Sequence, residues 1–205
     1  MIDWLLFIPA CFALNLAFGP NNLLAMNNGA RHGVLFAQKA AFGRLIVFIP
    51  MIAASALGLG LVLSASATLF NIVKVCGALY LIWLGIRLWR SAGSMALPTP
   101  VNPGYSVFAA FRSEAAVAIS NPKAILIFAA FFPQFVSQDA YWLSYALLGA
   151  SFLALEAIAI LAYATAGRFA ARVAAQRLPV MQRLSGATMA LFGVLLLFSP
   201  QPSRS

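Results

Sequence analysis

Two interruptions in long apolar segments place polar residues where continuous helices would otherwise run. The first is Gly19-Pro20-Asn21-Asn22 and the second is Asn121-Pro122-Lys123, and their prolines are 102 residues apart (122 − 20). A proline inside a helix removes a backbone donor and clashes with the preceding turn, so each segment should break there. Gly or Asn followed by Pro suits the start of a new helix, whose free N–H groups and dipole favour a carboxylate. The two breaks therefore predict a binding site for a ligand that carries a carboxylate.

Glu156, a carboxylate within another apolar run, is the next residue that could take part in chemistry. A helical rise of about 1.5 Å per residue places it ~18 Å from Arg168, while the two breaks lie ~12 and ~14 Å from the same basic side. An acidic residue at that depth is a functional-site candidate in a membrane protein. Glu156 either binds a substrate ammonium or the exchanged proton, or it is structural, paired with Lys123 or present as a hydrogen-bonded carboxylic acid.

Three further polar residues also need a position. Lys123 either faces a substrate carboxylate or neutralises Glu156. Tyr80, midway along an apolar run, either lines a cavity or packs among its neighbours. Glu114 is expected in the first turn of a helix, as a solvated acid that favours the helix N-terminus. The candidate substrate-binding residues are accordingly Gly19, Pro20, Asn21, Asn22, Tyr80, Asn121, Pro122, Lys123 and Glu156.

The composition indicates a membrane protein. Of 205 residues, 63% are hydrophobic and 8% are charged, and the mean hydropathy is +0.93; a soluble domain has about 25% charged residues. Because ~20 apolar residues span a bilayer, the sequence predicts an all-α protein with six transmembrane helices. The expected ranges are 3–27 (broken at Gly19-Pro20), 38–63, 69–89, 112–135 (broken at Asn121-Pro122), 142–166 and 181–198.

These helices divide into two groups of three. Residues 1–90 form the first three-helix repeat, 91–111 a proline-rich cytoplasmic linker, 112–198 the second repeat and 199–205 a polar tail. Ten of the 13 Lys and Arg, Arg44 among them, fall in three clusters after the first, third and fifth helices. The positive-inside rule places these clusters in the cytoplasm and both termini on the outer side. Since three is odd, the second group enters the membrane from the opposite side, an inverted repeat typical of secondary transporters.

The sequence gives little support to enzymatic, metal-binding or nucleic-acid-binding functions. The chain has a single His, no paired acids at catalytic spacing and no Gly-rich phosphate loop before a helix, so we expect no enzyme and no cofactor. Cys11 and Cys76 have no metal-ligand spacing and are interpreted as packing residues. The net charge of +9 comes from basic clusters between apolar runs, not from a surface for nucleic acid.

At these motifs the chain resembles the LysE/RhtB family of bacterial lysine and homoserine/threonine exporters. The resemblance rests on motifs in both halves: Gly19-Pro20-Asn21 with Gly29 and Gly33, Lys74-Val-Cys-Gly-Ala-Leu-Tyr-Leu-Ile-Trp-Leu-Gly85, Asn121-Pro122-Lys123-Ala124 and Phe132-Pro133-Gln134-Phe135. It implies a six-helix inner-membrane exporter of amino acids or related metabolites, driven by proton antiport and without a bound cofactor. This chain departs from the family pattern at Phe18, where members commonly have proline, and at Arg44 and Val47, where they tend to have small residues.

Taken together, the residues and the resemblance favour a multi-pass protein of the bacterial inner membrane that exports a small zwitterion. The expected partners are an amino-acid-like substrate, protons and the lipid bilayer, but no nucleic acid; a homodimer is left open. Three alternatives remain: a non-transporting scaffold or assembly subunit, an exporter of another small cation, and a passive pore.

Overall fold

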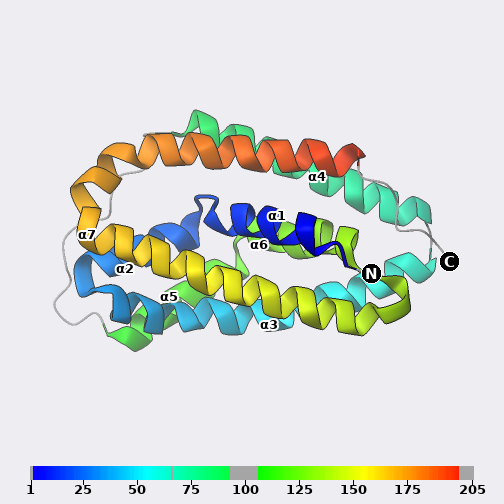
Figure 1. Ribbon diagram of the computed structural model, residues 1–205, viewed down its shortest axis with the longest axis horizontal. Coiled ribbons are helices and arrows are strands. Elements are labelled where there is room, and N and C mark those ends of the chain that lie inside the picture. The colour runs from blue at the N-terminus through cyan, green and yellow to red at the C-terminus, as the bar shows by residue number, and fades with distance from the viewer. Residues whose placement is uncertain (1, 66, 93–105, 199–205) are drawn as a thin grey trace.

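The computed structural model describes residues 2–65, 67–92 and 106–198, and every regular element in these ranges is helical (Figure 1). The all-α class predicted from the sequence is therefore confirmed for the described part of the chain. The predicted tail, 199–205, and most of the predicted linker, 93–105, lie outside the described residues.

Both predicted helix breaks are present. α1 (Trp4–Leu16) and α2 (Pro20–His32) meet at a bend of 62°, and α5 (Val107–Ile119) and the segment Pro122–Phe135 meet at a bend of 49°. Pro20 and Pro122 each lie in the first turn of the new helix, where the missing N–H group has no intrahelical partner to lose. Each break thus ends one helix and starts another, as the sequence predicts.

Two helix ends near the breaks differ from the prediction. α5 begins at Val107 and not at Arg112, because the Ser106 hydroxyl accepts a hydrogen bond from Ala109 N and caps the helix five residues earlier (112 − 107). α2 continues past Asn27 to His32, because Gly33, with φ of 91°, makes the whole turn into α3. Both broken segments are therefore longer than predicted on their basic side.

The predicted helix 112–135 is not a regular α-helix after the break. Its second part consists of α6 (Pro122–Leu126), the π-helical η1 (Ile127–Phe131) and the 3-10 helix η2 (Phe132–Phe135). Pro133 explains the irregularity, because it lacks an N–H group and its ring displaces a carbonyl of the preceding turn. Side chains compensate: the Ser55 hydroxyl donates to Phe128 O, and Gln134 Nε2 donates to Ala130 O at 3.5 Å.

The remaining helices are long. They are α3 (Val34–Ala65), α4 (Ala67–Arg90) and, after the short η3 (Gln138–Ala140), α7 (Tyr141–Phe198). α7 contains both the fifth and the sixth predicted helix, and its helical backbone continues between them, so the predicted interruption at 167–180 is wrong at the level of secondary structure. The chain nevertheless reverses there, because Figure 1 shows the two parts of α7 running in opposite directions.

Several of these helices can cross a membrane. Val34–Gly58, Tyr141–Phe169 and Pro179–Phe198 are long and apolar enough individually, and the number rises to five if each bent pair counts as one span. α4 corresponds to the remaining predicted span and is not among these five. The structure thus supports three to five spans, and the six-helix inverted repeat stays a prediction.

The inner halves of the broken segments, α1 and α6, lie between two layers of long helices (Figure 1). α4 and the second part of α7 form one layer, α3 and the first part of α7 lie on the opposite side, and α1 and α6 run between them. Glycines let some helix backbones touch. A Cβ atom added to Gly167 would lie 1.9 Å from Met26 O, and one added to Gly85 would lie 2.4 Å from Gly186 O. Such close approach requires glycine.

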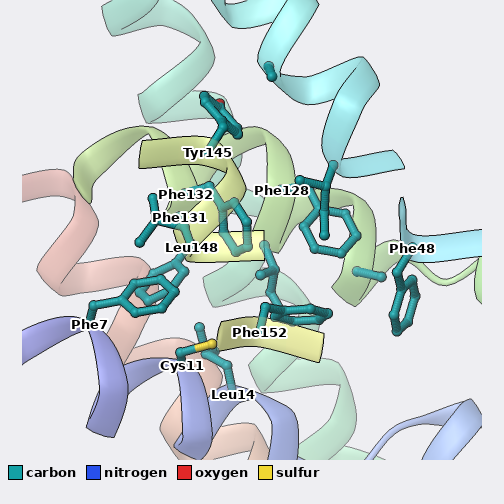
Figure 2. Packing of buried hydrophobic residues seen from close by; sticks show 14 of the residues in the cluster. Phe7, Cys11, Leu14, Phe48, Phe128, Phe131, Phe132, Tyr145, Leu148 and Phe152 are labelled. Carbon is teal, nitrogen blue, oxygen red and sulfur yellow. The ribbon is translucent and has the colours of Figure 1, made fainter. Parts of the chain in front are cut away.

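An aromatic core holds α6, η1 and η2 in place. Figure 2 shows Phe7 of α1, Phe128 and Phe132 of the broken segment and Phe152 of α7 packed together. The ring centroids of Phe128 and Phe152 are 4.9 Å apart at an interplanar angle of 74°, an edge-to-face contact that is favourable between aromatic rings. The carbonyl of Phe152 also accepts a hydrogen bond from Asn15 Nδ2 at 3.4 Å. The core therefore adjoins the polar residues at the break of α1 and α2.

The basic connections lie together at one end of the molecule. In Figure 1, α2 ends, α4 ends, α5 begins and α7 reverses at the left, whereas α1 begins and α7 ends at the right. Exposed basic side chains accompany these helix ends: Arg87, Arg90, Arg112 and Arg168. The side chains of Arg172 and Arg177 lie outside the described part. This clustering agrees with the charge pattern on which the predicted orientation rests.

Candidate functional site

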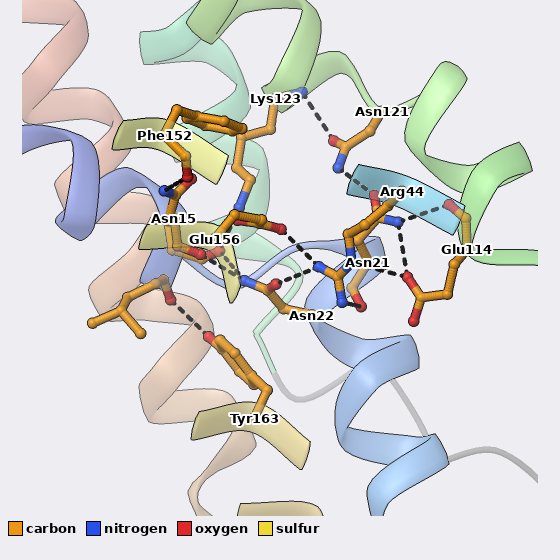
Figure 3. Close-up of polar contacts among 12 residues, drawn as sticks. Asn15, Asn21, Asn22, Arg44, Glu114, Asn121, Lys123, Phe152, Glu156 and Tyr163 are labelled. Atoms are coloured by element: carbon orange, nitrogen blue, oxygen red, sulfur yellow. Dashed lines mark hydrogen bonds and ion pairs between the residues drawn. The ribbon is translucent and has the colours of Figure 1, made fainter. Parts of the chain in front are cut away.

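Seven polar side chains meet where the two broken helices face each other, and we call them the polar cluster (Figure 3). They come from α2, α3, α5, the start of α6 and α7, and all are buried: Asn21, Asn22, Arg44, Glu114, Asn121, Lys123 and Glu156. The cluster contains two cations and two carboxylates, so its charges balance when all four groups are ionised. Charged groups are almost never fully buried unless they are paired, and the pairing here is extensive.

Arg44 is the centre of the polar cluster. Its side chain is 0% exposed, and its Nε atom lies 3.0 Å from Glu114 Oε2 while its Nη1 atom lies 2.8 Å from Glu156 Oε1. Nη1 also donates to Asn22 Oδ1, and Nη2 donates to the carbonyl of Asn21, both at 3.1 Å. One guanidinium thus links α3 to α2, α5 and α7. Removing one partner of such a buried pair typically costs about 3–5 kcal/mol, because the other charge is left unpaired.

The last carbonyls of α1 are satisfied by side chains from other helices. Lys123 Nζ donates to Leu14 O at 3.2 Å and to Ala17 O at 2.8 Å. Asn22 Nδ2 donates to Asn15 O and Ala17 O, and the Tyr163 hydroxyl donates to Leu16 O at 2.7 Å. A helix C-terminus favours a cation. Lys123 therefore neutralises the carbonyl end of α1, and no hydrogen bond or ion pair to Glu156 is found in the described structure.

The starts of α2 and α6 are joined directly. Asn121 Nδ2 donates to Asn21 Oδ1 at 2.8 Å, and Asn21 Nδ2 in turn donates to Glu114 Oε2 at 3.2 Å. The oxygen of the Asn121 side chain accepts from Lys123 N at 3.1 Å and caps α6. By contrast, Gly19 at the start of α2 has no side chain with which to cap that helix. The expectation of a free helix start at both breaks is therefore wrong for α6, where Asn121 occupies it.

The structure brings most of the predicted site residues together. Asn21, Asn22, Asn121, Lys123 and Glu156 belong to the polar cluster, and the side chain of Lys123 fills the space beside Gly19. Pro20 and Pro122 shape the two breaks and contribute no polar atom.

Tyr80 lies elsewhere. It is 38% exposed on α4, and its ring packs against Trp83 with a centroid distance of 5.2 Å. Tyr80 therefore does not join the polar cluster, and its exposed ring is not enclosed by its neighbours either.

Two charged residues of the site escaped the sequence prediction. Arg44 was expected in a cytoplasmic basic cluster, but it is buried ten residues into α3 (44 − 34), ~15 Å from the helix start. Glu114 was expected to be solvated in a first turn, but α5 starts earlier, so Glu114 lies in its second half and is 0% exposed. A charge inside an apolar run was the signal for Arg44, and Ser106 as a helix cap was the signal for Glu114.

Two buried acceptors of this region have no hydrogen-bond partner: Glu114 Oε1 and Asn15 Oδ1. Glu114 belongs to the polar cluster, where it pairs with Arg44, and Asn15 lies beside the cluster, since Asn15 O accepts from Asn22. Unpartnered buried acceptors are uncommon and ask for an explanation, such as a proton or a polar ligand that is present in another state. Within the described residues no group of His, Cys, Asp and Glu has the arrangement of a metal site.

Comparison with known proteins identifies the family. The sequence profile of the LysE type translocator family matches residues 12–199, which include both breaks and the whole polar cluster. The chain belongs to the LysE type translocator family. The resemblance drawn from the motifs is thereby confirmed, and with it the assignment as a membrane protein.

Three relatives each match about two thirds of the chain or more. The homoserine/homoserine lactone efflux protein of Salmonella typhi is 32% identical over 196 residues, which cover 94% of this chain and 95% of the relative. A leucine efflux protein of Salmonella choleraesuis (strain SC-B67) is 33% identical over 141 residues, 67% of this chain and 64% of the relative. An uncharacterized membrane protein of Vibrio cholerae is 29% identical over 161 residues, 78% of both chains. No solved structure matches the chain.

Proposed function

We propose that the protein is a secondary transporter that exports amino acids or similar small zwitterions across the inner membrane by proton antiport. The observation that carries the proposal is the buried polar cluster at the meeting point of two broken helices, in a chain of the LysE type translocator family. Transporter sites are commonly built where discontinuous helices meet near the middle of the membrane. The names of the efflux relatives support an exporter of amino-acid-like compounds.

The organisation of the helices supports an inverted repeat. Each broken pair is followed by two long helical stretches, α3 and α4 after the first pair and the two parts of α7 after the second. One helix of each broken pair, α1 or α6, lies between these stretches (Figure 1), so movement of one layer relative to the other would open the polar cluster to alternate sides. With the basic connections in the cytoplasm, both termini lie on the outer side.

In this proposal Glu156 and the start of α2 form the substrate site. Glu156 holds the substrate ammonium or the exchanged proton, and the uncapped N-terminus of α2 favours the substrate carboxylate. The closed polar cluster corresponds to the substrate-free protein, in which the Glu156 carboxylate is paired with Arg44. Glu114, with one unpartnered carboxylate oxygen, is a second group that could accept a proton in the transport cycle.

The role of Glu156 is tested with Glu156→Gln in proteoliposomes, where export of homoserine and leucine is driven by an imposed pH gradient. We expect the variant to lose gradient-driven export, because an amide can neither carry the proton nor balance an ammonium. Asp139→Asn is the matched control, since Asp139 is exposed and outside the polar cluster. If Glu156→Gln exports at the wild-type rate with unchanged pH dependence, the proposed role is wrong.

Accessibility separates a carrier from an assembly subunit. Cysteines introduced at Asn22 and Ala124, which are both buried, are expected to react slowly with a membrane-impermeant maleimide and to change their rate when substrate is added. The background would carry substitutions of Cys11 and Cys76. A scaffold whose breaks only shape packing would show no substrate effect, and a passive pore would show no counterflow.

A further inference from the structure

The pairing of Arg44 suggests how the site would choose its substrate. Arg44 lies between two buried carboxylates, with Nη1 2.8 Å from Glu156 Oε1 and Nε 3.0 Å from Glu114 Oε2. Lys123, the other cation of the polar cluster, is engaged by the carbonyl end of α1. With all four groups ionised, the cluster is therefore electrically balanced without any ligand, and each cation has defined partners. A ligand that enters must either preserve this balance or leave a buried charge without compensation.

A zwitterion can enter the Arg44–Glu156 pair without upsetting the balance. If an amino acid inserts between the two side chains, its carboxylate pairs with Arg44 and its ammonium pairs with Glu156. One ion pair is then replaced by two, while Arg44 keeps its contacts with Glu114 and with Asn21 O. The guanidinium suits this exchange, because its donors are arranged in a fixed fork that matches a carboxylate. The start of α2 is adjacent, since Arg44 also donates to Asn22 Oδ1.

A ligand with a net charge has no such solution. The second ammonium of lysine would have no free carboxylate to pair with, because Glu156 and Glu114 are already paired. A ligand without a carboxylate would place its ammonium beside Arg44 with no anion between them. Burying a charge without a partner is strongly unfavourable. Discrimination on the order of 100-fold against a net charge of one is therefore expected from a site that stays closed around its ligand.

We infer that the Arg44–Glu156 ion pair is the point of substrate entry and that Arg44 restricts the substrate to net-neutral zwitterionic amino acids. The inference rests on the proposed export function and adds to it the substrate class and a specificity-determining residue. Arg44 takes the carboxylate beside the N-terminus of α2, Glu156 takes the ammonium, and Glu114 keeps Arg44 in position between them.

The wild-type protein gives the first test, by counterflow in proteoliposomes loaded with norleucine. Norleucine and lysine have side chains of equal carbon number and differ in the terminal ammonium. External norleucine should be taken up, whereas lysine, norleucinamide (net positive) and N-acetylnorleucine (net negative) should each be at least ~100-fold poorer competitors. Competition by lysine within about threefold of norleucine would overturn the inference while leaving export intact. Absence of counterflow with every amino acid would instead count against the proposed function.

Variants at position 44 give the second test. Arg44→Gln leaves two carboxylates and one buried cation, so the ratio of lysine to norleucine transport should rise at least ~10-fold. Arg44→Lys keeps the charge and should keep the exclusion of lysine. Lys39→Gln removes a cation from the exposed side of the same helix and should leave the ratio unchanged. A ratio in Arg44→Gln equal to that of the wild type would also overturn the inference. If Arg44→Gln does not fold, the wild-type competition series and Arg44→Lys decide.

Discussion

The contact between α2 and the first part of α7 gives a prediction whose size follows from the geometry. A Cβ atom on Gly167 would lie 1.9 Å from Met26 O and 2.8 Å from Met26 C. Carbon and carbonyl oxygen pack at roughly 3.3 Å, so Gly167→Ala requires the two backbones to separate by roughly 1.4 Å. Backbone atoms cannot rotate away as a side chain does. Overpacking typically costs about 1–3 kcal/mol, and we expect Gly167→Ala at the upper end.

The measurement is a thermal scan of the purified protein in detergent, followed by tryptophan fluorescence. A loss of ~3 kcal/mol corresponds to a fall in the apparent Tm on the order of 6–12 °C for a chain of this size. The matched control is Gly58→Ala, because no atom lies within 4 Å of a Cβ at this position in α3. This control should be neutral or stabilising by up to ~1 kcal/mol, since alanine favours a helix over glycine.

The same substitution should also affect transport. α2 carries Asn21 and Asn22, and α7 carries Glu156, so separation of the two helices lengthens the contacts within the polar cluster. We expect Gly167→Ala to export more slowly than Gly58→Ala at equal amounts of folded protein. An apparent Tm of Gly167→Ala within about 2 °C of the wild type would refute the reasoning, because the backbone contact would then be too loose to exclude a methyl group.

Two further predictions concern the break itself. Lys123→Met removes the cation and two hydrogen bonds at the end of α1, so the folded protein should lose at least ~3 kcal/mol of stability. The control Lys39→Met, on the exposed side of α3, should stay within ~0.5 kcal/mol of the wild type in the same thermal scan. Asn21→Ala and Asn121→Ala should be non-additive by ~0.5–1.5 kcal/mol in a double-mutant cycle, because their side chains share one hydrogen bond; strict additivity would mean that the bond between the two helix starts contributes nothing.

The helix breaks could be predicted from the sequence because their cause is local. Pro20 and Pro122 interrupt a helix wherever they occur in one, and Gly19 and Asn121 suit the position before a new helix. The depth of Glu156 in the membrane can likewise be predicted, because it depends only on counting residues along one helix. These features predict that five residues of the polar cluster lie at similar depth: Asn21, Asn22, Asn121, Lys123 and Glu156.

The partners of the buried charges could not be predicted in the same way. Which face of α3 turns inward decides whether Arg44 meets solvent or Glu156, and that rotation depends on packing between helices far apart in sequence. The sequence leaves open whether Lys123 faces a substrate carboxylate or neutralises Glu156. In the structure Lys123 instead reaches the carbonyl end of α1, whose position depends on the bend angle. Glu114 was misplaced for a simpler reason, because Ser106 starts α5 earlier than the linker composition indicated.

We propose that the polar cluster at the two breaks binds an amino acid and exchanges it across the membrane. The most direct test is counterflow of radiolabelled homoserine and leucine by the wild-type protein in proteoliposomes, with orientation and insertion verified. We expect the label to accumulate transiently, and only when unlabelled amino acid is present inside. In a parallel assay, we expect Glu156→Gln to lose the export that a proton gradient drives. Label that equilibrates at the same rate with and without internal amino acid, or does not enter at all, would contradict the proposal.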